Sequence, residues 1–224
     1  METFRRFEKK YLLTDEQFSQ FLYLMKGHVM PDAFYETDIR SIYYDTSDHE
    51  LIRRSIEKPE YKEKLRVRSY GEVKGDEPVF VELKKKFDGI VYKRRTKALS
   101  RQLLTDIYHC SFKDPQVGKE IMYALNYYGR LRPSIFIGCK RVSFVGKEDK
   151  DLRITFDRDI TYRMEDLSLS RSEKDKQLTD KTVMELKIKD AMPLWLTQIL
   201  DEIKAYPRGY SKAGSAFLKE LQGV

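Results

Sequence analysis

The feature that most constrains this sequence is an alternation of charged and apolar residues at every second position. A period of two places the charged side chains on one face of a β-strand and the apolar side chains on the other. The pattern recurs in the segments 6–11, 39–45, 62–70, 79–84, 93–95, 141–144, 152–157 and 184–189. Eight strands suit a small closed barrel, so the sequence predicts a closed eight-stranded antiparallel β-barrel.

Basic residues dominate the polar faces of these predicted strands. In chain order they include Lys10, Lys64, Arg66, Arg68, Lys84, Lys93, Arg95, Arg141, Arg153 and Lys187. Three acidic residues share those faces, namely Glu8, Glu82 and Glu185. One such strand is also typical of a half-exposed sheet with a solvated polar face. Because nearly every strand carries Lys or Arg, we expect the charged face to point inward and line a channel.

Amphipathic patterns between the strands predict helices that cover the apolar outside of the barrel. Thr14 with Gln17, and Ser47 with Glu50, have the spacing of a capping box. Further helices are expected over about 100–110, 115–128, 193–206 and 211–221. The polar stretch 163–181 is interpreted as a mobile loop. Without an internal repeat or a linker rich in Pro or Gly, residues 1–224 are expected to form one α+β domain.

The overall composition agrees with a globular protein that has an anionic partner. The chain has 43 Lys and Arg against 36 Asp and Glu, a net charge of +7, while 41% of its residues are hydrophobic. It contains no apolar run long enough to span a membrane, and its first ten residues lack the apolar stretch of a signal peptide. We therefore expect a cytoplasmic protein without a membrane span.

The residue types on the charged faces favour a chain of phosphates as the ligand. Arg binds phosphate oxygens with two parallel hydrogen bonds, and Lys supplies a compact positive charge. Glu residues among them would oppose the binding of phosphate alone, so their presence indicates a divalent cation, Mg or Mn, that bridges carboxylate and phosphate. Phosphoryl transfer or hydrolysis follows, because such reactions need positioning and charge neutralisation rather than a side-chain nucleophile.

Eight short motifs, in order over nearly the whole chain, carry a family resemblance. They are Phe7–Tyr11, Ser41–Asp45, Lys64–Gly71, Phe80–Lys85, Lys93–Arg95, Arg153–Asp157, Glu185–Lys187 and Tyr210–Lys212. Together they resemble the VTC domain, the polyphosphate polymerase branch of the triphosphate tunnel metalloenzymes (CYTH-like proteins). The resemblance implies an eight-stranded tunnel, a nucleoside triphosphate bound with Mg or Mn, and transfer of its terminal phosphate to a growing polyphosphate chain.

The resemblance also implies roles for individual residues. We expect catalysis to depend on four basic residues, namely Lys10, Arg66, Arg68 and Lys84. The resemblance assigns four others to phosphate binding, Lys93, Arg141, Arg153 and Lys212, and the alternating faces add Lys64, Arg95 and Lys187. Ser211 joins them because it lies near the N-terminus of a predicted helix, where free backbone N–H groups favour phosphate. In the predicted strand 93–95, a shift of one residue would exchange Lys93 with Arg94 on the charged face.

The expected metal ligand is Glu185, with Glu8 and Glu82 as further candidates. For Glu8 and Glu82 the alternative role is to pair with a neighbouring Lys or Arg. The donor is expected to be ATP, and any transfer of product across a membrane would require a separate membrane partner protein.

Two other functions remain open from the sequence. One is a tunnel-type triphosphatase that hydrolyses nucleotide or inorganic triphosphate, because related enzymes share much of the basic lining. The other is a binding protein that holds polyphosphate without turnover. Nucleic acid is not expected as a partner, because aromatic residues are not interleaved with the basic ones as a stacking platform would require.

Overall fold

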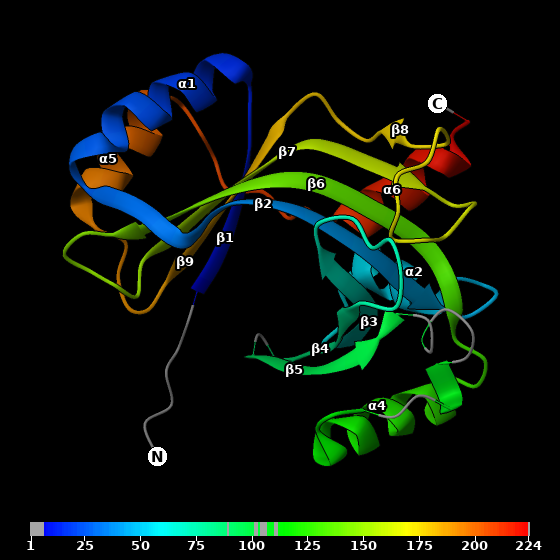
Figure 1. Ribbon diagram of the computed structural model, residues 1–224. Helices are drawn as coiled ribbons and strands as arrows, with labels where there is room; N and C mark the ends of the chain where they lie inside the picture. Colours follow the sequence, from blue (N-terminus) through cyan, green and yellow to red (C-terminus); the bar gives the residue numbers. More distant parts are fainter. Residues whose placement is uncertain (1–6, 89, 101–102, 104–106, 110–111, 224) are drawn as a thin grey trace. The chain divides into compact units, whose positions relative to one another are not determined.

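A computed structural model describes residues 7–88, 90–100, 103, 107–109 and 112–223. The strands are β1 (Phe7–Leu13), β2 (Val29–Asp45), β3 (Tyr61–Tyr70), β4 (Pro78–Phe87), β5 (Ile90–Leu99), β6 (Arg132–Gly146), β7 (Arg153–Arg163), β8 (Lys176–Gln177) and β9 (Thr182–Ile188). The α-helices are α1 (Asp15–Leu24), α2 (Glu50–Glu57), α4 (Pro115–Tyr127), α5 (Leu194–Glu202) and α6 (Lys212–Leu221). Short 3-10 helices span Met25–Gly27 (η1) and Ile107–His109 (η2). The α+β class is confirmed, and each predicted strand segment overlaps an observed strand (Figure 1).

The chain divides into two compact units, each with its own hydrophobic core. Unit 1 consists of residues 1–38, 139–160 and 179–210, and unit 2 consists of residues 39–138, 161–178 and 211–224. Strands β2, β6 and β7 contribute residues to both units.

In unit 1 the apolar face of the sheet is covered by helices α1 and α5, which lie side by side (Figure 1). Met184, Leu186 and Ile188 of β9 are buried in this core. Because side chains alternate along a strand, the residues between them, Glu185 and Lys187, lie on the opposite face.

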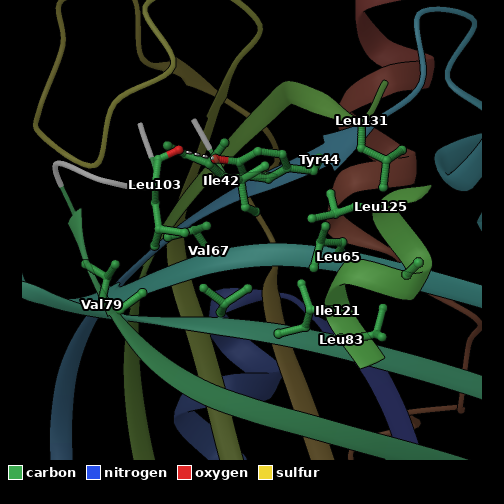
Figure 2. Close-up of a cluster of buried hydrophobic side chains, with 14 of the residues drawn as sticks. Ile42, Tyr44, Leu65, Val67, Val79, Leu83, Leu103, Ile121, Leu125 and Leu131 are labelled. Carbon is green, nitrogen blue, oxygen red and sulfur yellow. Dashed lines mark hydrogen bonds between the residues drawn. The ribbon is translucent and has the colours of Figure 1, made fainter. Parts of the chain in front are cut away.

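In unit 2 the core forms between the sheet and α4. Leu65 of β3 and Leu83 of β4 are paired directly in the sheet and pack in one cluster with Ile121 and Leu125 of α4 (Figure 2). The alternating residues Lys64 and Arg66, like those of β4, therefore lie on the face away from α4.

The strand order in the sheet is β1-β9-β7-β6-β2-β3-β4-β5, and β8 pairs with β7. Every ladder whose register is described is antiparallel. The order is an open path that ends at β1 and β5, and no ladder between these two strands is found in the described residues. Closure of the sheet into a barrel therefore stays a prediction.

Two predicted capping boxes have different outcomes. At α1 the box is confirmed, because Thr14 Oγ1 accepts a hydrogen bond from the backbone N–H of Gln17, and the Gln17 side chain accepts one from the N–H of Thr14. At α2 the prediction of a box at Ser47 is wrong. The Asp45 carboxylate accepts from the N–H groups of Leu51 and Ile52 instead.

Three of the four remaining helix predictions are confirmed with shifted bounds. The segments 115–128 and 211–221 match α4 and α6 closely, whereas α5 ends at Glu202 rather than near residue 206. The predicted helix 100–110 lies partly outside the described residues, and the residues described there as helical are Ser100, Leu103 and those of η2.

The stretch 163–181 contains the short strand β8 and is organised around the buried side chain of Arg163. Its guanidinium donates to the backbone oxygens of Asp166, Ser168 and Ser170 and forms an ion pair with Asp175. These contacts order the segment locally, and its mobility stays a prediction.

None of the helices that the structure describes has the length and apolar character needed to cross a bilayer.

Candidate anion-binding faces

The charged face of unit 2 consists of two neighbouring rows of residues across strands β3, β4 and β5. In one row Lys64 lies opposite Lys84, which lies opposite Lys93. In the next row Arg66 lies opposite Glu82, which lies opposite Arg95. The register thus places Lys93 and Arg95 on the predicted face, while Arg94 lies on the other face and pairs with Glu120 of α4 at 2.9 Å.

The lysine row, Lys64–Lys84–Lys93, places like charges directly opposite one another. Such pairs destabilise a sheet in the absence of a counter-ion. Burial lowers the pKa of Lys93, and the positive charges of Arg66 and Arg68 lower it further, although Glu82 acts in the opposite direction. An anion bound along the row would relieve the repulsion between these like charges.

Glu82 neutralises part of the adjacent row. Its side chain is only 1% exposed, and its carboxylate lies 2.7 Å from Arg66, 2.8 Å from Lys93 and 3.4 Å from Arg95. Burial raises the pKa of this carboxyl group, but the charges of Arg66, Arg68 and Lys93 outweigh burial and lower the pKa of Glu82 to about 2. Glu82 is thus ionised and held by basic side chains, which is the alternative role considered for it.

Arg68 and Arg95 complete the basic face at its other end. Arg68 is largely buried and donates from Nε to Ser41 Oγ at 3.1 Å. The guanidinium of Arg95 lies 3.6 Å from the centre of the Phe80 ring and donates to Tyr70 Oη at 3.0 Å. Stacking on an aromatic ring keeps a guanidinium plane in a defined orientation.

The N-terminus of α6 reaches the same rows. Ser211 is the residue that caps this helix, and its Oγ accepts hydrogen bonds from the N–H of Gly214 at 3.2 Å and from Lys64 Nζ at 2.9 Å. Lys212 is the first residue of the helix. The predicted placement of Ser211 and Lys212 at a helix N-terminus is confirmed, and Ser211 is joined directly to the lysine row.

Sequence reasoning gave no role to Tyr43, although its motif was noted. Tyr43 lies on β2 directly opposite Arg66, and Arg66 Nη1 donates to its phenolic oxygen at 3.0 Å. The alternation that selects Lys and Arg also places Tyr43 on this face, so the signal was present but was obscured by the common use of Tyr in strands.

The charged face of unit 1 mixes the two signs more evenly. Lys10 Nζ lies 3.5 Å from the Glu8 carboxylate and 3.8 Å from that of Glu185, and Lys187 Nζ lies 3.1 Å from Glu185. In register, Lys10 pairs with Glu185 and Glu8 pairs with Lys187. Lys10 Nζ also donates to the backbone oxygen of Tyr210 at 3.3 Å.

Arg141 and Arg153 differ in how strongly contacts within the protein fix their side chains. Arg141 forms two hydrogen bonds with the buried Asp157, of 2.5 and 2.7 Å. Burial lowers the pKa of Arg141, but this pairing outweighs burial and raises it, so the guanidinium stays charged. Arg153 is exposed, and it lies 3.6 Å from Asp32. The alternation along β7 places Asp157 on the same face as Arg153, but its pairing with Arg141 depends on contacts between strands.

Within the part of the chain that the structure describes, no group of three or more His, Cys, Asp or Glu side chains could hold a metal ion by themselves. Glu8 and Glu185 are nevertheless close to one ammonium group, that of Lys10. Mg²⁺ is usually bound by one or two carboxylates together with substrate phosphates and water. These two carboxylates fit that mode of binding, whereas Glu82 is already surrounded by three basic groups.

Fold and site together define an α+β protein whose antiparallel sheet carries a concentrated and partly neutralised basic face. The sequence matches the family model of the VTC domain over residues 5–217. The chain therefore belongs to the VTC domain family, as its motifs predicted.

Comparison with solved structures finds a similar fold in one protein and weaker matches in two others. A Bacillus halodurans protein, provisionally described as an adenylate cyclase, has a TM-score of 0.57 at 13% identity, covering 91% of this chain and 92% of that one. A Pyrococcus horikoshii protein has a TM-score of 0.47 at 14% identity, covering 98% and 99%. A Vibrio parahaemolyticus protein, also provisionally described as an adenylate cyclase, has a TM-score of 0.42 at 12% identity, covering 91% and 86%. Curated proteins gave no match.

Proposed function

We propose that this protein is a metal-dependent polyphosphate polymerase that transfers the terminal phosphate of ATP to a growing polyphosphate chain. The observation that carries the proposal is the lysine row, three ammonium groups in register beside Arg66 and Arg95. Neighbouring strands are about 4.8 Å apart, so the row spans about 10 Å, which is more than one phosphate covers. A chain of phosphates would neutralise the row along its length.

The guanidinium and ammonium groups would act by neutralising charge. In phosphoryl transfer the protein mainly positions the reactants and stabilises the charge on the transferred group. Arg66 and Arg68 would bind phosphate oxygens with their forked donors, and Lys84 and Lys10 would supply point charges. Glu82 and Asp157 would hold Arg66 and Arg141 in place without reaching the substrate.

Glu185 and Glu8 are the residues that we propose for Mg²⁺ or Mn²⁺. These two carboxylates would hold the metal, which when bound would neutralise charge on the triphosphate. Their present contacts with Lys10 and Lys187 keep both carboxylates paired. We further propose that the sheet closes into the tunnel implied by the family, so that substrate and product phosphates are enclosed by basic side chains.

The direct test is incubation of the purified protein with ATP and Mn²⁺, followed by separation of the products. We expect long-chain polyphosphate to accumulate together with ADP. Release of orthophosphate without polymer would contradict polymerisation and identify a triphosphatase. Intact ATP together with tight binding of added polyphosphate would identify a binding protein without turnover.

The metal assignment has its own variant. Glu185→Gln keeps the size of the side chain but removes the charge that would hold the metal, so we expect loss of polymer formation with the melting temperature little changed. The matched control is Glu202→Gln on α5, whose carboxylate is exposed and accepts a hydrogen bond from Gln20. Equal activity of Glu185→Gln and the wild type would refute the assignment.

A further inference from the structure

Tyr43 lies on the basic face of unit 2, beside the side chains that we propose to bind phosphate. It is half-buried and lies opposite Arg66 in the β2–β3 ladder. Arg66 donates a hydrogen bond to its oxygen, which leaves the phenolic O–H, when it is present, free to donate elsewhere. The two rows otherwise consist of Lys and Arg side chains and the buried Glu82, so Tyr43 is the phenol that faces this cluster of cations.

The surroundings of Tyr43 favour its ionised form. Burial raises the pKa of a phenol, but the charges of Arg66, Lys64 and Arg68 outweigh burial and lower the pKa of Tyr43 to about 7. The charges that lower the pKa of Tyr43 are those of Arg66, Lys64 and Arg68 on β3, and Glu82 on β4 pairs with Arg66. Ser55 of α2 and Ala213 of α6 line one small cavity together with Tyr43, and neither can be ionised at ordinary pH.

We propose that Tyr43 binds the phosphate chain directly and gains a proton when the chain binds. Without ligand, the phenolate supplies a negative charge next to Arg66. An incoming polyanion repels that charge and competes for the same guanidinium, so the phenolate takes up a proton. The phenol then donates its new O–H to a phosphate oxygen, while its oxygen still accepts from Arg66. This inference rests on the proposed function for its ligand.

The proton balance of this step is simple. One O–H bond forms at Tyr43 Oη, and no electrons are transferred. The proton comes from solvent or from the terminal phosphate of the chain, because a phosphate monoester has its second pKa near 6. In the second case Tyr43 would leave the terminal phosphate fully ionised, which is the form that attacks a phosphoryl donor.

The free protein tests the acid–base part without any ligand. Tyrosinate absorbs in the ultraviolet at longer wavelength than tyrosine, so a pH titration counts the ionised tyrosines. We expect one tyrosine to ionise near pH 7, about three units below an ordinary phenol. Tyr43→Phe should lack this step. The control Tyr44→Phe should retain it, because Tyr44 is buried on the other face and donates to the backbone oxygen of Leu103 (Figure 2).

Binding of inorganic tripolyphosphate tests the ligand part. With metal removed by a chelator, so that no turnover occurs, the affinity of the wild type should fall about tenfold for each pH unit above Tyr43's own pKa. Near pH 6 the affinity of Tyr43→Phe for tripolyphosphate should be within about threefold of that of the wild type, because only one hydrogen bond is lost. Near pH 9 Tyr43→Phe should bind tripolyphosphate more tightly than the wild type, because the variant has no phenolate to compete with the ligand. Any contribution from Lys93 is common to both proteins.

Calorimetry of the same binding in two buffers of different ionisation enthalpy counts the protons directly. We expect uptake of about one proton near pH 8 in the wild type and in Tyr44→Phe, and about one fewer in Tyr43→Phe. Tripolyphosphate binding with equal proton uptake in all three proteins would overturn the inference and leave the proposed function standing. A tyrosine that titrates near pH 7, combined with no tripolyphosphate binding at any pH, would overturn the proposed function and the ligand role of Tyr43 with it.

Discussion

At the scale of single residues, Glu82 explains how so many cations can share one sheet face. Its carboxylate contacts Arg66, Lys93 and Arg95, which come from both neighbouring strands. A buried charge is tolerated when charges of opposite sign lie close to it. Glu82 therefore holds the basic side chains in place, and its removal would leave three like charges without a common partner.

The pH dependence of stability tests this role. The pKa of Glu82 is about 2 in the folded protein against 4.5 for a free Glu side chain, a difference equivalent to about 3 kcal/mol. Because the folded pKa is the lower one, this stability is fully present above about pH 4.5 and is lost as the pH falls toward 2. Glu82→Gln should lower the free energy of unfolding by about that amount near neutral pH, and by less in acid.

Denaturant unfolding at several pH values measures this difference. The control Glu120→Gln removes an exposed pair with Arg94 and should change stability by less than about 1 kcal/mol. A Glu82→Gln protein that is as stable as the wild type at neutral pH would show that the basic face does not need its carboxylate.

At the scale of elements, the starts of α1 and α2 show when a local pattern is reliable. Thr14 and Gln17 cap α1 within four residues of sequence, so the motif alone is sufficient. At α2 the preceding residue, His49, is in the left-handed region with φ 59°, and the chain enters the helix from the end of β2. This geometry brings Asp45 and Thr46, rather than Ser47, to the free N–H groups.

Stability measurements can compare these caps. Thr14→Ala should lower the free energy of unfolding by about 1 kcal/mol, the usual cost of losing an N-cap. Ser47→Ala should change it by no more than about 0.5 kcal/mol, because Ser47 is exposed and does not cap α2. Urea unfolding of the two variants measures both changes in the free energy of unfolding. A larger loss in Ser47→Ala than in Thr14→Ala would support the capping box that the sequence predicted at α2.

At the scale of the whole molecule, binding of a polyanion would offset the positive charge of the basic face. The lysine row brings like charges together, and a bound polyanion would remove their repulsion. A ligand that binds only the folded protein stabilises it by about 2.7 kcal/mol at a hundredfold excess over its Kd. Exposed charges are screened by salt, so this gain should be largest at low ionic strength.

Thermal unfolding with and without tripolyphosphate measures this effect. We expect tripolyphosphate to raise the Tm by several degrees at low salt, to raise it less at high salt, and to exceed orthophosphate at equal ionic strength, because only the longer ion spans the lysine row. A Tm that does not respond to tripolyphosphate at low salt would be incompatible with a phosphate-binding face.

The sequence by itself determined where eight of the strands lie and, within most of the expected segments, which side chains share a face, but it missed residues 29–38 of β2, residues 132–140 of β6 and the short strand β8. A period of two is a local property, so Lys64, Arg66 and Glu82 could be assigned to the charged face without a structure. The order of eight motifs was likewise sufficient to place the chain in its family.

Only the tertiary structure decided which charges meet. Contacts across a sheet depend on register between strands that are distant in sequence, and the alternation within one strand carries no information about it. Register brings Lys64, Lys84 and Lys93 into one row and places Tyr43 against Arg66. The pairing of Arg141 with Asp157, and of Glu82 with its three cations, follows from the same long-range geometry, because a side chain takes the partner that folding places within reach.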